Sequence, residues 1–249
     1  MSLGAIAILG VTILATSFIA GVFGMAGGMI LLGVLLIYFD VATGMVMFSL
    51  LQFSANVSRV VLWRKFILWP IFLKFALGGA VAFAIMRLIA FIPDKSVVYL
   101  VLGGMPFCVE ALPRAWRPNI EWRLVPYVAG FLTTIVLLIA GSGGLFLDVF
   151  FQKSKLDRKT TVATKAACHT FGHVFRIGYF APLGASVDVL PLWAIGGAVV
   201  LAIAGTALAP LVLNRMTDHG FRQWTRGIIL VVSATYLLRA GWLYWHAAS

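Results

Sequence analysis

The chain has 249 residues, of which 62% are hydrophobic and 11% are charged, whereas about 25% of the residues of a soluble domain are charged. This composition excludes an ordinary soluble domain, and its continuous apolar runs favour membrane-spanning helices over a barrel of alternating strands. The formal net charge of +11 would suggest nucleic-acid binding in a soluble protein, but in a membrane protein it is typical of basic cytoplasmic loops. We therefore predict an all-α polytopic membrane protein without a nucleic-acid partner.

Ten apolar segments follow one another along the chain, and we expect each of them to be helical. They occupy residues 3–19, 25–39, 43–63, 67–92, 96–112, 124–140, 143–152, 160–180, 188–213 and 224–247. The first is read as a retained membrane segment, since no basic stretch and no small-residue cleavage site mark a signal peptide. Cys108 and Cys168 both lie in apolar segments, so neither a disulfide nor a metal site is expected.

Two of these segments are too short to cross a membrane as helices. Residues 25–39 and 143–152 would rise about 22 and 15 Å, against a hydrocarbon core of about 30 Å. Each follows a glycine-rich break, so we predict a bent or re-entrant hairpin that is buried in protein or lines a cavity.

The chain repeats itself. The ten residues around Gly78-Gly79 resemble those around Gly196-Gly197, and the break at Gly27-Gly28 resembles the one at Gly143-Gly144. We therefore predict two membrane repeats, residues 1–115 and 124–249, each with one hairpin and three spanning helices, joined by a cytoplasmic linker at 116–123. Because a hairpin returns the chain to the side on which it began, the second repeat starts on the opposite side, and the repeats have inverted topology.

The charges support this topology. Of the 19 basic residues, 12 fall on one side, which we therefore assign to the cytoplasm; they are Arg64, Lys65, Arg114, Arg117, Arg123, Lys153, Lys155, Arg158, Lys159, Arg215, Arg222 and Arg226. The opposite side has Arg87 and Lys95 with Asp40, Asp94 and Asp188. Both termini then face outward from an inner (plasma) membrane.

Ionisable side chains within membrane segments indicate function, because they are costly to bury. The segment 160–180 places four on one helical face, namely Lys165, His169, His173 and Arg176. At an offset of 117, Gln52, Asn56 and Arg59 are their counterparts in the first repeat. We expect the two polar faces to meet near the midplane and bind substrate. As alternatives, Arg59 and Arg176 extend to the membrane interfaces, or the stripe is purely structural.

The glycine breaks are the second candidate feature. A half-helix that begins at Gly28 or Gly144 presents unpaired N–H groups, so Gly27, Gly28, Ser142, Gly143 and Gly144 are expected to contact an anion. The alternative is close helix packing, which we predict for Gly78-Gly79 and Gly196-Gly197. Asp148, one turn beyond Gly144, either pairs with Lys165 or Arg176 or takes part in proton coupling.

Cations, amides and helix N-termini with one mid-membrane acid favour an anion as substrate. The glycine breaks, the polar helix after each and the repeated GGAV together resemble the sulfite exporter TauE/SafE (TSUP) family. That resemblance implies a secondary transporter of sulfite, thiosulfate or an organosulfonate such as sulfoacetate, without a cofactor, working by alternating access. His173 stands where many members have asparagine, so His169, His173 and Asp148 are candidates for proton coupling. A passive anion channel and a membrane enzyme that uses His169 and His173 remain open.

Overall fold

The computed structural model describes residues 3–23, 25–186, 190–213 and 215–248, and within these ranges the chain contains helices and no strand. The α-helices are α1 (Leu3–Phe23), α2 (Met25–Tyr38), α3 (Val41–Leu62), α4 (Trp69–Ile89), α5 (Lys95–Ala111), α6 (Val125–Ala140), α7 (Gly144–Phe151), α8 (Arg158–Phe180), α9 (Leu192–Leu208), α10 (Pro210–Leu213) and α11 (Asp218–Ala248). Short 3₁₀ turns are η1 (Arg64–Phe66), η2 (Arg114–Trp116) and η3 (Ala181–Leu183).

The predicted all-α membrane class is confirmed, and the helices fall where the apolar segments predict them. Two boundaries differ for clear reasons. The predicted segment 188–213 contains two helices, because Pro210 lacks the N–H that would continue α9. Helix α11 begins six residues earlier than predicted, because its first turns are polar and carry no apolar signal. Asp188 lies outside the described residues.

Four of the described helices are long and apolar enough to cross a membrane, namely α1, α3, α4 and α11. Helices α2, α6 and α9 are apolar but shorter. Helix α7 has eight residues, so it rises only about 12 Å and cannot cross the hydrocarbon core by itself. The first glycine break therefore follows a full-length helix, whereas the second joins two short ones.

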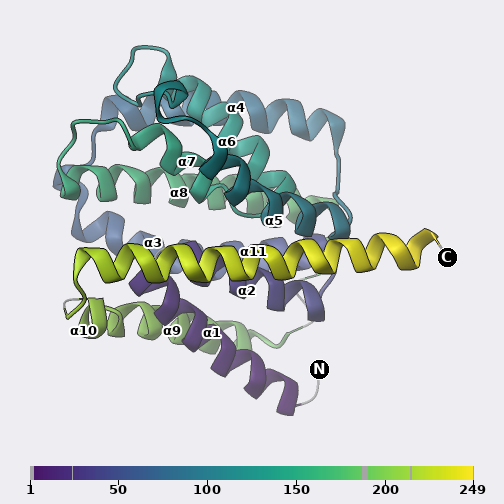
Figure 1. The fold of residues 1–249 in the computed structure, drawn as a ribbon. Coiled ribbons are helices and arrows are strands. Elements are labelled where there is room, and N and C mark those ends of the chain that lie inside the picture. The colour runs from purple at the N-terminus through teal and green to yellow at the C-terminus, as the bar shows by residue number, and fades with distance from the viewer. Residues whose placement is uncertain (1–2, 24, 187–189, 214, 249) are drawn as a thin grey trace.

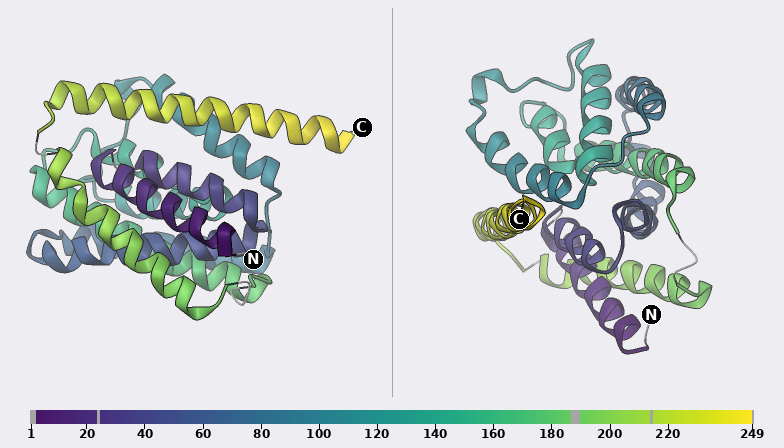
Figure 2. Two further views of the ribbon diagram at one scale, coloured as in Figure 1. Left: turned by 90° about the horizontal axis from the view of Figure 1, so that it is seen from below. Right: turned by 90° about the vertical axis from the view of Figure 1, so that its right-hand side faces the viewer.

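The helices pack as pairs around a central crossing. Helices α3 and α8 pack against each other in the interior, with α4 and α6 paired on the side of α8 and α1 and α9 paired on the side of α3 (Figure 1). Helix α5 pairs with α11, which runs along the outside of the bundle (Figure 2). The two ends of the chain lie at the same end of the bundle in both views.

Glycines allow two of these pairs to approach closely. A Cβ atom on Gly78 of α4 would lie 2.0 Å from the Tyr127 carbonyl oxygen of α6, and one on Gly130 would lie 1.9 Å from the Phe75 carbonyl oxygen. Gly205 of α9 meets the Leu14 carbonyl of α1 in the same way. Close packing was therefore correctly predicted for Gly78. It was wrong for Gly196 and Gly197, whose Cβ positions have no atom within 4 Å; Gly197 instead lines an apolar cavity.

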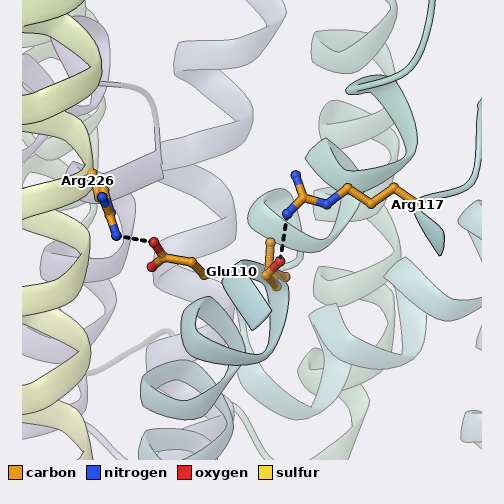
Figure 3. A network of polar contacts seen from close by, with 4 residues as sticks. Glu110, Arg117 and Arg226 are labelled. Atoms are coloured by element: carbon orange, nitrogen blue, oxygen red, sulfur yellow. Dashed lines mark hydrogen bonds and ion pairs between the residues drawn. The ribbon is translucent and has the colours of Figure 1, made fainter. Parts of the chain in front are cut away.

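Connections at one end of the bundle are tied together by polar contacts. Arg226 of α11 pairs with Glu110 of α5, and Arg117 of the linker contacts Gln152 at the end of α7 (Figure 3). The Ile120 backbone N–H also donates to the Phe150 carbonyl at 2.8 Å. The linker between the two halves of the chain is thus anchored to the end of α7.

We expect the repeated Gly-Gly motif to respond unequally to the same substitution. Gly78→Ala should lower the melting temperature of the purified protein, because the new methyl group meets backbone that cannot move aside, at a cost of about 1–3 kcal/mol or more. Gly196→Ala is the matched control and should leave it unchanged or slightly raised. Equal losses in both variants would contradict this assignment of the packing.

Candidate functional site

The polar stripe of α8 is positioned by the way that this helix begins. The Asp157 carboxylate accepts hydrogen bonds from the Lys159 and Thr160 backbone N–H groups at 2.9 and 3.0 Å, which satisfies donors that a helix start leaves free. Bonds from the Thr160 side chain and backbone hold the pKa of Asp157 below its ordinary value. From this start α8 runs 23 residues against α3, so its polar face meets the counterpart face of α3.

Arg176 lies where the last turns of α8 pack against α3, and it is fully buried. Its Nε donates to the Ser49 hydroxyl of α3 at 2.5 Å, and Nη1 donates to the Gly141 carbonyl at the end of α6. The guanidinium also lies over the Phe48 ring, 4.6 Å from its centroid. Arg176 therefore connects α8, α3 and the α6–α7 break, and it does not extend to an interface.

His173 completes this cluster, and its contact identifies the tautomer. Its Nδ1 lies 3.0 Å from Nη2 of Arg176. A guanidinium only donates hydrogen bonds, so Nδ1 must accept, which leaves the ring neutral with its proton on Nε2. A protonated His173 would point an N–H at the guanidinium of Arg176, which has no acceptor for it. The structure thus uses His173 to hold Arg176.

Asp148 and Lys165 form an ion pair between α7 and α8. Of the two partners that the sequence leaves open for Asp148, Lys165 is the one found and Arg176 is not, while a role of Asp148 in proton coupling stays a prediction. The side chains are 33% and 25% exposed, so the pair is partly reachable by solvent.

Arg59 and His169 differ from the cluster around Arg176. Both side chains are partly exposed, and neither forms a hydrogen bond or ion pair among the described residues. The charges of Lys165, Asp148, Arg59 and Arg176 all act on the His169 ring, with that of Arg176 the weakest, so His169, Arg59, Lys165 and Asp148 form a second group within electrostatic reach of Arg176. Lys165 and Arg176 are separated by about 16 Å along α8, which places this second group toward the linker end of the helix. The predicted polar stripe is therefore divided into a buried part and a partly exposed part.

The amides of α3 lie between these two parts. The Asn56 side chain donates to the Gln52 carbonyl of its own helix at 2.8 Å. Nε2 of Gln52 lies 2.9 Å from the position that a Cβ on Gly28 would take, so Gln52 lies against the start of α2. Gln52, the α3 counterpart of His169, is thus placed beside one glycine break, as Arg176 is beside the other.

At both breaks the glycines also pack against the preceding helix. A Cβ on Gly27 would lie 2.2 Å from the Thr16 carbonyl oxygen, and one on Gly143 would lie 3.0 Å from that of Thr133. Gly144 is buried and Ser142 is partly exposed. Helix α7 begins at Gly144 without a side-chain cap. Close packing at these glycines is thus present, and contact with an anion stays a prediction.

Two residues of the site were missed by sequence reasoning. Ser49 was not predicted as a partner of Arg176, although it lies on the same face as Gln52 and Asn56 at helical spacing. Phe48 carried no signal, because one more phenylalanine in an apolar helix is unremarkable in sequence.

The charges at the crossing do not balance. Beyond the first turn of α8, helices α3, α7 and α8 contain three cations, Arg59, Lys165 and Arg176, and one carboxylate, Asp148. With the histidines neutral, two positive charges are left without a carboxylate in these three helices. An uncompensated positive charge in a low-dielectric region attracts anions and repels cations.

An apolar cavity of about 120 Å³ lies elsewhere, between α1, α2, α3 and α9. Residues such as Leu9, Phe39 and Trp193 line it, and it contains none of the charged residues described above. It is chemically unsuited to an anion. Among the described residues no group of histidine, cysteine or acidic side chains is arranged to hold a metal ion.

Comparison with protein families gives one match. The model of the family described as "Sulfite exporter TauE/SafE" matches residues 8–236. No curated protein and no solved structure matches the chain.

We expect the Asp148–Lys165 pair to be energetically coupled. Asp148→Ala should destabilise the protein by about 1–3 kcal/mol, because it leaves Lys165 partly buried without its partner. Adding Lys165→Met should recover most of that loss in a double-mutant cycle measured by unfolding in detergent. Arg226→Ala breaks the more exposed pair with Glu110 and is the control, with a loss below about 1 kcal/mol. Additive effects of Asp148→Ala and Lys165→Met would contradict the coupling.

Proposed function

We propose that this chain, which belongs to the sulfite exporter TauE/SafE family, is a secondary transporter of small sulfur-containing anions such as sulfite, thiosulfate or sulfoacetate. The observation that carries the proposal is the excess of positive charge at the α3–α8 crossing. The family indicates a membrane transporter, and the apolar helices indicate that the protein is embedded in the membrane.

We place the anion beside Arg59, His169 and Lys165, with Gln52, Asn56 and the half-helix starts at Gly27-Gly28 and Ser142–Gly144 nearby. Arg59 and His169 are partly exposed and have no partner among the described residues, so they are free to receive an anion. Lys165 already has Asp148 as a partner, so an incoming anion competes with that carboxylate for it. Arg176 is fully occupied in this conformation and holds the α6–α7 break.

An inverted-repeat architecture is supported by the choice of packing partners. In the proposed repeats α1 corresponds to α6, α2 to α7, α3 to α8, α4 to α9 and α5 to α11. Replacing each helix of the α1–α9 pair by its counterpart gives the pair α6–α4, and both pairs are in contact. The pairs α3–α8 and α5–α11 become themselves. Such a two-fold relation would let the two groups of helices exchange conformations, which is the basis of alternating access.

We assign the linker end of the bundle to the cytoplasm, because the 12 basic residues belong to the connections at that end. The contacts of the linker with the end of α7 and of Lys159 with the Phe66 ring support this grouping. Both termini, which lie at the other end, would then face outward from the inner membrane (Figure 1).

Counterflow in proteoliposomes tests the function. A transporter should show saturable uptake of labelled sulfite, thiosulfate or sulfoacetate, accelerated by the same anion inside the vesicle. A passive channel would conduct without saturation or counterflow. A membrane enzyme would convert the anion without net translocation, and either result would overturn the proposal.

Arg59→Gln should weaken anion binding about 10- to 100-fold, because a charge-assisted hydrogen bond contributes roughly 1.5–3 kcal/mol. Binding is measured by ligand-induced thermal stabilisation. Lys74→Gln, which removes a cation that instead contacts the Arg123 carbonyl, should leave affinity unchanged. An unaltered affinity in Arg59→Gln would place the anion elsewhere.

Affinity should fall as the pH rises through the histidine range, because an anion draws a proton onto a neighbouring imidazole. We assign this coupling to His169, since His173 already accepts from Arg176. His169→Gln should flatten the dependence, whereas His173→Asn should keep it. Affinity is measured with an anion whose own charge is constant over that range, and a flat wild-type curve would refute proton coupling.

A further inference from the structure

The two repeats differ in exposure at corresponding positions of α3 and α8. At the offset of 117, Leu62 is 77% exposed while its counterpart Tyr179 is 0% exposed. Arg59 is partly exposed, whereas Arg176 is fully buried. The last turns of α3, at the linker end, are therefore more open than the last turns of α8 at the other end.

The same asymmetry appears in the hydrogen bonds. Arg176 donates to Ser49, which lies ten residues before Arg59 in α3. It also donates to the Gly141 carbonyl at the α6–α7 break. The Ser49 hydroxyl is oriented for this role, since it donates to the Met45 carbonyl at 2.7 Å and so turns a lone pair toward Arg176. At the position that corresponds to Ser49, α8 has Ala166, which offers no side-chain acceptor to Arg59.

We propose that Arg59 and Arg176 engage alternately, and that Ser49 is a positioning residue that favours engagement of Arg176. The engaged arginine closes its end of the α3–α8 crossing by holding a glycine break, and the free arginine faces the anion. In this conformation Arg176 is engaged and Arg59 is free, so the site opens toward the linker end. In the opposite conformation Arg59 is engaged and Arg176 is released.

This inference rests on the proposed function, because it assigns the two conformations to transport. Its physical basis is that a buried guanidinium has to satisfy its donors, so it occupies discrete positions with acceptors available. The loss or gain of one acceptor therefore shifts the balance between two states.

Two substitutions test the proposal from opposite directions. Ser49→Ala removes the acceptor from Arg176, and Ala166→Ser supplies a hydroxyl at the corresponding position for Arg59. Each should shift the ratio of the two conformations about tenfold or more toward the state with Arg59 engaged. Ser49→Ala removes a hydrogen bond to a charged group from the present state, and Ala166→Ser adds one to the opposite state. Ser54→Ala is the control, because that hydroxyl donates only within α3, to the Leu50 carbonyl.

The measurement is hydrogen–deuterium exchange of the full chain without substrate, followed in residues 56–63 and 173–180. In Ser49→Ala and Ala166→Ser, protection should fall in 173–180 and rise in 56–63, while Ser54→Ala should match the wild type. No change in either variant, or loss of protection in both segments together, would overturn the proposal. If Ser49→Ala does not fold, Ala166→Ser decides alone, because a rise in protection of 56–63 cannot come from general destabilisation.

Counterflow of the same preparations separates the two hypotheses. If the protection moves in opposite directions but no sulfur anion is transported, the alternation of the arginines stands and the proposed function fails. If transport is present and protection does not move, the function stands and the alternation is refuted.

Discussion

The arrangement of this protein depends on the burial of one guanidinium. Removing a charge from water costs several kcal/mol even after relaxation, and that cost is offset only where the donors are satisfied. Arg176 meets it with the Ser49 hydroxyl, the Gly141 carbonyl and His173. Because these acceptors come from α3, from the end of α6 and from α8 itself, the requirement fixes three elements relative to one another.

Glycines at the outer helix crossings also hold α8 and α3 in place. Gly78 and Gly130 bring α4 and α6 into backbone contact, and Gly205 does so for α9 and α1. These pairs flank α8 and α3 (Figure 1), and where α8 packs against α3 the Arg176 and His173 side chains are buried. An α8 that is too polar to lie alone in lipid is thereby stable within the bundle.

Chemically similar residues 117 positions apart reach different environments. Arg59 and Arg176 occupy corresponding positions, yet one is buried with three hydrogen-bonding partners and the other is partly exposed. Ser49 and Ala166 break the equivalence at the point where an acceptor matters most.

The sequence by itself determined the helical membrane class, the order and approximate ends of the helices and the shortness of α7. It could do so because apolar runs and glycine breaks are local signals. It also identified the residues that carry charge, since a cation in an apolar segment is visible without a fold. It could not tell which of two repeated Gly-Gly motifs packs, because Gly78 and Gly196 differ only in what lies opposite them.

The tertiary structure alone decided how the polar stripe is divided. Whether Asp148 pairs with Lys165 or with Arg176, and whether His173 donates or accepts, depends on distances across helices that sequence spacing does not contain. The same holds for Ser49, which a hydrophobicity pattern treats as one more small residue until α8 is packed against α3. Local chemistry fixes which groups are present in the membrane, and only packing across the chain determines which of them are satisfied and which are left free to bind.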